Sequence, residues 1–174
     1  MGILKQIIYN FKMMKKADKL KALRNEELLA FSDEELYNAL EIICYFAVYD
    51  INDVDLTNEQ RVCSTLLNLD AEVNNGGLCQ FFVNSSRAFA PFVSESLSAI
   101  KADKTKELFD SFISENNIDL KDLNSFIIKD LSEFAEQNNR YPFDDFDNKY
   151  YEIGEVNDLM IRYARENINA IINR

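Results

Sequence analysis

The sequence contains no histidine, and it has only 4 glycines, 2 prolines and 3 cysteines among 174 residues. Without histidine, the chain has neither a Ser-His or Cys-His catalytic pair nor an imidazole ligand for a metal ion. A metal site made from carboxylates alone would need closely spaced acidic ligands, as in calcium loops, and the sequence has no such motif. These absences predict a non-enzymatic protein with no catalytic residues, no cofactor and no bound metal.

The other scarce features restrict the fold and the compartment. Cys44, Cys63 and Cys79 are odd in number and lie in apolar stretches, which suggests reduced thiols in a cytoplasmic protein rather than a disulfide framework. No apolar run approaches the roughly 18 residues of a transmembrane helix. So few glycines and prolines disfavour a β-sandwich or barrel, which needs a turn about every 8–12 residues.

Apolar residues make up 47% of the chain and recur at the three- and four-residue spacing of helices. Ser32 with Glu35, and Thr57 with Gln60, have the spacing of capping boxes that begin helices. The pattern therefore predicts an all-α fold, a single compact domain of about seven to eight helices. The helices are expected over residues 3–24, 32–50, 57–73, 78–86, 92–101, 104–115, 120–137 and 155–173, whereas residues 140–154 fit a loop or a short helix.

Charge is distributed unevenly along the chain. Residues 1–24 hold seven basic residues and one acid, which gives a formal charge of +6. Because the net charge of the whole chain is −11, the other 150 residues carry −17. Residues 25–60 contain ten acids and no Lys or Arg. Such a surface repels nucleic acid and attracts basic partners. We therefore expect an acidic domain over residues 25–174 that does not bind nucleic acid directly.

The basic segment 1–24 has an apolar stripe and predicts an amphipathic N-terminal helix. This helix has two possible binding partners. Its charge complements the acidic domain, so it could dock there and add its apolar stripe to the core. Alternatively, its lysines could hold it on an anionic membrane surface. We favour docking. Lysines interrupt the apolar run, which is not the pattern of a secretory signal.

The segment EVNNGGLCQFFVNSS, residues 72–86, predicts a tight joint between two helices. Glycine at a helix end adopts left-handed backbone angles that other residues resist, and asparagine tolerates them. Glu72, Gln80 and Asn84 are then expected to tie neighbouring helices together, because buried amides need partners. The alternative is a small-ligand pocket or an enzymatic site built on the same polar cluster. A phosphate loop is disfavoured, since no strand precedes the glycines and no G-K-[ST] follows.

The same segment resembles a bacterial domain family whose best-known member is a DNA-mimic protein that blocks a transcription factor. The resemblance covers roughly residues 30–170, with a core of the form N-G-G-x-x-Q-[FY]-[FVL]-x-N-S. Leu78 stands where an aromatic residue is common in the family. The resemblance implies a helical fold, no established catalysis and competition with DNA for a basic protein. The residues that carry it, read as a fold signature, are Glu72, Asn75, Gly76, Gly77, Gln80, Phe81, Asn84 and Ser85.

The densest group of acids follows residue 143 and is expected to bind the partner. With only Lys149 among them, its members are Asp144, Asp145, Asp147, Glu152, Glu155 and Asp158. Carboxylates three or four residues apart on a helix can approximate a row of phosphates. Phe143, Phe146, Tyr150 and Tyr151 lie between them, and aromatic residues beside charges suit a protein interface. The alternatives are a DNA-mimic surface for a basic protein, such as a transcription regulator or a nuclease, and a merely solvated face. The oligomeric state stays open.

Overall fold

The computed structural model describes residues 3–45, 51–52 and 55–172. Throughout this part of the chain the regular structure is helical and no strand occurs, so the all-α fold class is confirmed, with a few more helices than expected. The α-helices are α1 (Ile3–Lys21), α2 (Asn25–Leu29), α3 (Asp33–Leu40), α4 (Asn58–Val83), α5 (Val93–Ala99), α6 (Asp103–Glu115), α7 (Leu131–Asn138), α8 (Phe143–Ile153), α9 (Val156–Glu166) and α10 (Ile168–Ile172). Three short segments that are wound more tightly or more loosely than an α-helix join them: η1 (Glu41–Tyr45), η2 (Ser85–Phe92) and η3 (Asn124–Phe126).

Both expected capping boxes begin helices. The Ser32 hydroxyl accepts the Glu35 N–H at 3.2 Å, and the Glu35 carboxylate accepts the Ser32 N–H at 2.8 Å. Thr57 and Gln60 exchange the equivalent bonds, each 3.0 Å long, at the start of α4. These bonds satisfy N–H groups that have no partner within the first turn of a helix.

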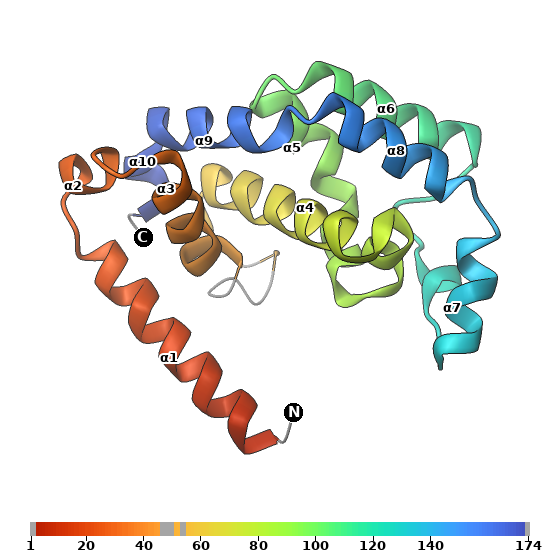
Figure 1. The fold of residues 1–174 in the computed structure, drawn as a ribbon, viewed down its shortest axis with the longest axis horizontal. Coiled ribbons are helices and arrows are strands. Elements are labelled where there is room, and N and C mark those ends of the chain that lie inside the picture. The colour runs from red at the N-terminus through yellow and green to blue at the C-terminus, as the bar shows by residue number, and fades with distance from the viewer. Residues whose placement is uncertain (1–2, 46–50, 53–54, 173–174) are drawn as a thin grey trace.

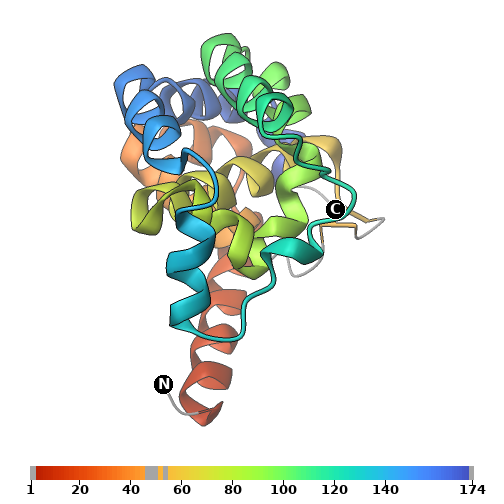
Figure 2. The same ribbon diagram turned by 90° about the vertical axis from the view of Figure 1, so that its right-hand side faces the viewer.

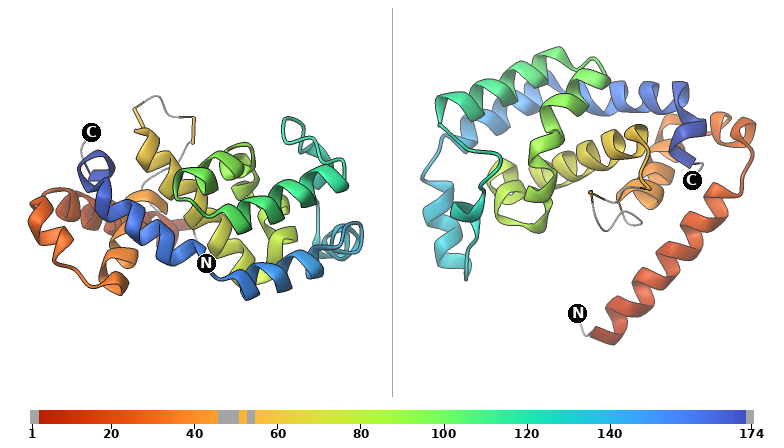
Figure 3. Two further views of the ribbon diagram at one scale, coloured as in Figure 1. Left: turned by 90° about the horizontal axis from the view of Figure 1, so that it is seen from above. Right: turned by 180° about the vertical axis from the view of Figure 1, so that it is seen from behind.

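Helix α4 runs through the middle of the molecule, and η2, α5, α8 and α9 pack around it (Figure 1). Most of its side chains are buried, including Leu66, Leu69 and Phe82. Seen from above, α8 and α9 follow one another along one edge, with α6 beside α8 (Figure 3). The long central helix thus supplies the core, and the α8–α9 edge supplies an outer face.

An aromatic cluster fastens α8 to this core. Phe143 and Phe146 lie three residues apart on the inner face of α8 and are buried. Phe82 of α4 stacks on Phe126 with ring centroids 4.7 Å apart, and Phe112 of α6 lies 5.3 Å from Phe143. Because the inner face of α8 is filled by these rings, its acidic residues lie on the flanks and the outside.

Two expected helices differ from the structure. The predicted helix over 120–137 exists only as α7, because residues 116–130 form turns around η3. Asp130 caps α7 by accepting the Ser132 N–H at 2.8 Å, which places the helix start at Leu131, eleven residues later than predicted. The predicted helix over 155–173 is divided into α9 and α10 at Asn167. Residues 140–154, expected to form a loop or a short helix, contain the helix α8, and Gly154 ends it with a left-handed φ of 57°.

Helix α1 leaves the body at α2 and extends away from it (Figures 1 and 2). Its second half contacts the core, where Ala17 is buried and Leu20 packs against it. Phe11 and Met14 remain exposed. The docking favoured from the sequence is therefore present at one end of α1. None of the helices in the described part of the chain combines the length and apolar character needed to span a bilayer.

Candidate functional site

The two adjacent glycines break α4 into two helical halves. Gly76 has φ −163° and ψ 22°, and Gly77 has φ 81° and ψ 176°. Only Gly77 lies in the backbone region that disfavours side chains. A Cβ on Gly77 would also collide with the Asp147 carboxylate, whereas a Cβ on Gly76 would meet the end of the Gln80 side chain. The tight joint expected from NNGG is confirmed, and Gly77 is the residue that requires glycine.

Glu72 is the acceptor that ties the two sides of the joint together. Its carboxylate accepts hydrogen bonds from Gln80 at 2.6 Å, Asn84 at 2.9 Å and the Ser86 hydroxyl at 2.7 Å. The interpretation of Glu72, Gln80 and Asn84 as a structural tie therefore agrees with the contacts. Ser86, which is buried, makes the third bond, while the neighbouring Ser85 is exposed at the start of η2. Phe81 is fully buried in the core.

Asp147 of α8 closes the other side of the joint. Its Oδ1 accepts the Leu78 N–H at 2.9 Å, and this N–H begins the second half of α4. Burial raises the pKa of Asp147, the Leu78 bond lowers it, and the nearby Asp144 raises it, with a net upward shift. Burial and Asp147 raise the pKa of the Cys79 thiol to about 11. Asp147 thus acts as a helix cap in a half-buried place.

A second buried carboxylate, Asp70, joins three other helices to α4. The Tyr150 hydroxyl donates to its Oδ1 at 2.9 Å, and Tyr37 and Asn157 each donate to its Oδ2 at 3.3 Å. Burial and the charge of Asp70 raise the pKa of both tyrosines. Sequence reasoning missed this role, since these four residues are far apart in the chain. Asp70 is a packing group at the junction of α3, α4, α8 and α9.

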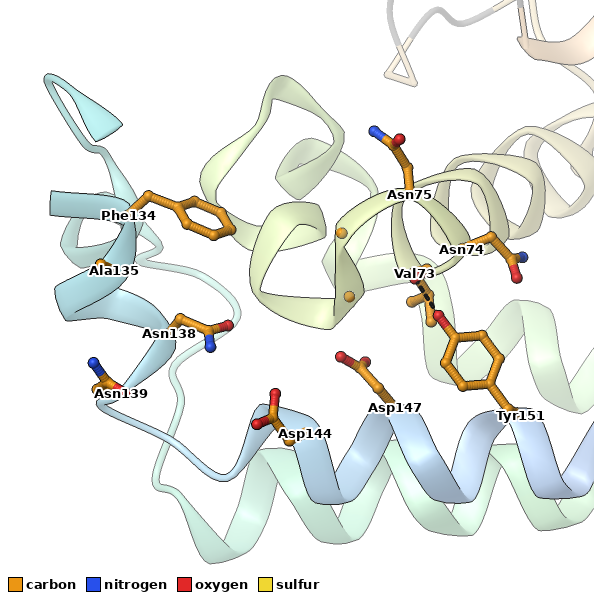
Figure 4. A pocket seen from close by; sticks show the side chains of 12 residues that line it. Val73, Asn74, Asn75, Phe134, Ala135, Asn138, Asn139, Asp144, Asp147 and Tyr151 are labelled. Atoms are coloured by element: carbon orange, nitrogen blue, oxygen red, sulfur yellow. Dashed lines mark hydrogen bonds between the residues drawn. The ribbon is translucent and has the colours of Figure 1, made fainter. Parts of the chain in front are cut away.

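A cleft of about 560 Å³ opens between the joint, α7 and α8 (Figure 4). Phe134 and Asn138 point into it from α7, and Asp144 and Asp147 point toward the joint from α8. Tyr151 stands at the far end, with its hydroxyl bonded to the Val73 carbonyl at 2.7 Å. Asn74, Asn75 and Asn139 also line the cleft, and the side chain of Asn75 points away from the two carboxylates (Figure 4).

The six acids expected to bind a partner fall into two groups. Asp144, Asp145, Glu152 and Asp158 are exposed, whereas Asp147 and Glu155 are partly buried. Glu155 Oε1 accepts the Thr105 N–H at 3.0 Å and so holds the start of α6. Asp158 lies in a separate pocket that is lined also by Asp33, Arg162 and Arg165, so cations offset its charge. Of these six acids, the exposed ones with no cation beside them are therefore Asp144, Asp145 and Glu152 of α8.

The interpretation of the aromatic residues between these acids as an interface is wrong for three of the four. Phe143, Phe146 and Tyr150 are at most 5% exposed, because they form the inner face of α8. Tyr151 alone is exposed, at 51%. The spacing of three and four residues could have shown this, since it is the spacing of a buried helical stripe.

Residues 54–167 match the family model described as DMP19-like protein. The chain belongs to this family. The DNA-mimic family expected from the NNGG segment is confirmed at this level, while the part played by the individual motif residues stays a prediction. No curated protein and no solved structure matches the chain.

The DMP19-like match covers some helices of the structure and leaves out others. It begins at residue 54, later than the start near residue 30 that the resemblance implied, and it ends one residue after α9. The glycine joint, the cleft and α8 all fall within it. Helices α1, α2, α3 and α10 fall outside it. The family region therefore contains both the joint and the exposed acids of α8.

Proposed function

We propose that this DMP19-like protein is a non-enzymatic acidic binding protein that occupies the DNA-binding surface of a basic partner, such as a transcription regulator. Membership of the family is consistent with DNA mimicry. The observation that carries the proposal is the set of exposed carboxylates on α8, namely Asp144, Asp145 and Glu152. Among the described residues, no Lys or Arg forms an ion pair with them.

The spacing of these acids suits contact with groups that bind a phosphate backbone. Asp145 and Glu152 are seven residues apart, so they share one side of α8 and lie about 10 Å from each other along the axis. A DNA strand carries one charge per roughly 3.4 Å. The row on α8 therefore corresponds to about every third phosphate of a strand, with Asp144 beside it.

The acidic body would guide such a partner over a longer range. Residues 25–174 carry a formal charge of −17, and α8 contributes four acids and one lysine. A field of this kind accelerates association with a positively charged surface and excludes free DNA, which is also negative. Competition with DNA then follows from use of the same basic surface by both.

Affinity capture from a bacterial lysate on the immobilised full chain tests this function. We expect basic DNA-binding proteins to be retained at low salt, released at moderate salt, and displaced by added duplex DNA. The control column carries the variant Asp144→Asn, Asp145→Asn, Glu152→Gln and should retain much less of the same proteins. A captured partner that holds the chain and duplex DNA at the same time would refute the proposal.

A further inference from the structure

The cleft at the glycine joint has a negative electrostatic potential. Two carboxylates, Asp144 and Asp147, line it, and no Lys or Arg does so in the part of the chain that the structure describes. Asp147 uses one oxygen to cap Leu78, and its Oδ2 is the atom that a Cβ on Gly77 would meet. Asp144 is exposed, and Asp147 is half-buried beside it.

Two helix C-termini lie at the rim of the cleft, next to the N-termini of α8 and of the second half of α4. The first half of α4 ends at the rim of the cleft, by Asn74 and Asn75, and α7 ends there by Asn138. The carbonyl groups at a helix C-terminus carry partial negative charge and favour a cation.

Two aromatic side chains line the cleft. Phe134 from α7 stands at one end and Tyr151 from α8 at the other, with the two carboxylates between them (Figure 4). Aromatic faces attract guanidinium and ammonium groups, and arginine more often than lysine. A volume of about 560 Å³ is in the range of ligand pockets.

We propose that this cleft binds an arginine side chain presented by the basic partner, with the guanidinium group beside Asp144 and Asp147 and against the ring of Phe134. Arginine fits better than lysine, because its planar fork donates to several acceptors at once and stacks on aromatic rings. The inference rests on the proposed function, since it names the group by which the partner is held next to the exposed acids of α8. It also separates Asp144, which lines the cleft, from the adjacent Asp145, which does not.

A titration of the isotope-labelled full chain with N-acetyl-arginine amide, followed by amide NMR, tests the cleft. We expect saturable shifts at Gly76, Gly77, Leu78 and Asp147, and none with the uncharged isostere N-acetyl-citrulline amide. The Asp144→Asn variant should bind the arginine derivative about tenfold more weakly, because a charge-assisted hydrogen bond is lost. Asp145→Asn is the matched control and should bind it within about twofold of the parent, as an exposed acid outside the cleft.

Phe134→Ala supplies a second variant, for which we expect about fivefold weaker binding through loss of the aromatic face. Free arginine should bind more weakly than the blocked amide, because its own carboxylate would face a negative cleft. Tighter binding of the free amino acid would indicate a metabolite site and would overturn the assignment to a partner's side chain.

Three further results would also overturn the inference. They are equal binding of the citrulline derivative, shifts that map outside the cleft or do not saturate, and equal weakening by Asp144→Asn and Asp145→Asn. If the titration fails while capture of a DNA-competing partner succeeds, the arginine site in the cleft is refuted and the proposed function stands. If capture fails as well, both are lost.

Discussion

The acids at the glycine joint are hydrogen-bonded within the fold, whereas those on the outer side of α8 are exposed to solvent. Glu72 accepts three side-chain hydrogen bonds and Asp147 caps a helix. Asp145 and Glu152 are exposed, and they accept no such bond within the described structure. The comparison teaches that the number of acids in this segment overstates the charge available to a partner, since part of it holds the fold together.

The same contrast separates stability from binding. A carboxylate that satisfies buried donors is costly to remove, because its partners are left without hydrogen bonds. An exposed carboxylate contributes little to folding, and its charge acts at long range instead. Substitutions at the joint should therefore change the free energy of unfolding, and substitutions on the outside of α8 should change association.

The largest effect is expected at Gly77. Replacement by alanine should destabilise the protein by about 3 kcal/mol, because the left-handed backbone is strained and the Cβ displaces Asp147. Gly76→Ala should cost only about 1 kcal/mol, since its Cβ meets the flexible end of Gln80. Urea denaturation of the two variants measures the difference. Equal costs would mean that the joint does not depend on the conformation of Gly77.

A smaller loss is expected when Glu72 is replaced by alanine. The donors of Gln80 and Ser86 would lose their acceptor near the joint, at a cost of about 2 kcal/mol. Glu152→Ala removes the same side chain from an exposed position and should stay within about 0.5 kcal/mol of the parent. Thermal or urea melts of both variants test the contrast. A Glu72 variant as stable as the Glu152 variant would show that the three bonds contribute nothing.

Asp147 should produce a modest dependence of stability on pH. Its pKa in the folded protein lies above the ordinary 3.8, so the folded state keeps this proton more firmly than the unfolded state does. The resulting contribution is complete at low pH and is lost as pH rises from the unfolded pKa through the folded one. Asp147→Asn stays uncharged and keeps an oxygen for the Leu78 N–H.

Unfolding of parent and Asp147→Asn should therefore be compared between about pH 3 and pH 7. The difference in stability should move in favour of the variant as pH rises. Movement in favour of the parent would mean that capping by the charged carboxylate outweighs its burial.

Local patterns predicted much of the fold and part of the site. Capping boxes and apolar spacing predicted the starts of α3 and α4, and the pair of glycines predicted the joint, because these features act within a few residues. The Asp70 bonds to Tyr37, Tyr150 and Asn157 could not be predicted in this way, since they join four helices. The start of α7 was missed because apolar residues at 120, 123 and 127 imitate a helical stripe while the backbone there forms turns.

The most direct test of the central claim compares two variants with the same net charge. One is Asp144→Asn, Asp145→Asn, Glu152→Gln on α8, and the other is Glu107→Gln, Glu115→Gln, Glu166→Gln at exposed positions elsewhere. The measurement is the association rate with the captured partner over a series of salt concentrations. We predict that the α8 variant loses most of the rate and of its salt dependence, while the other variant keeps most of both. Equal losses in the two variants, or no loss in either, would contradict a specific binding surface on α8.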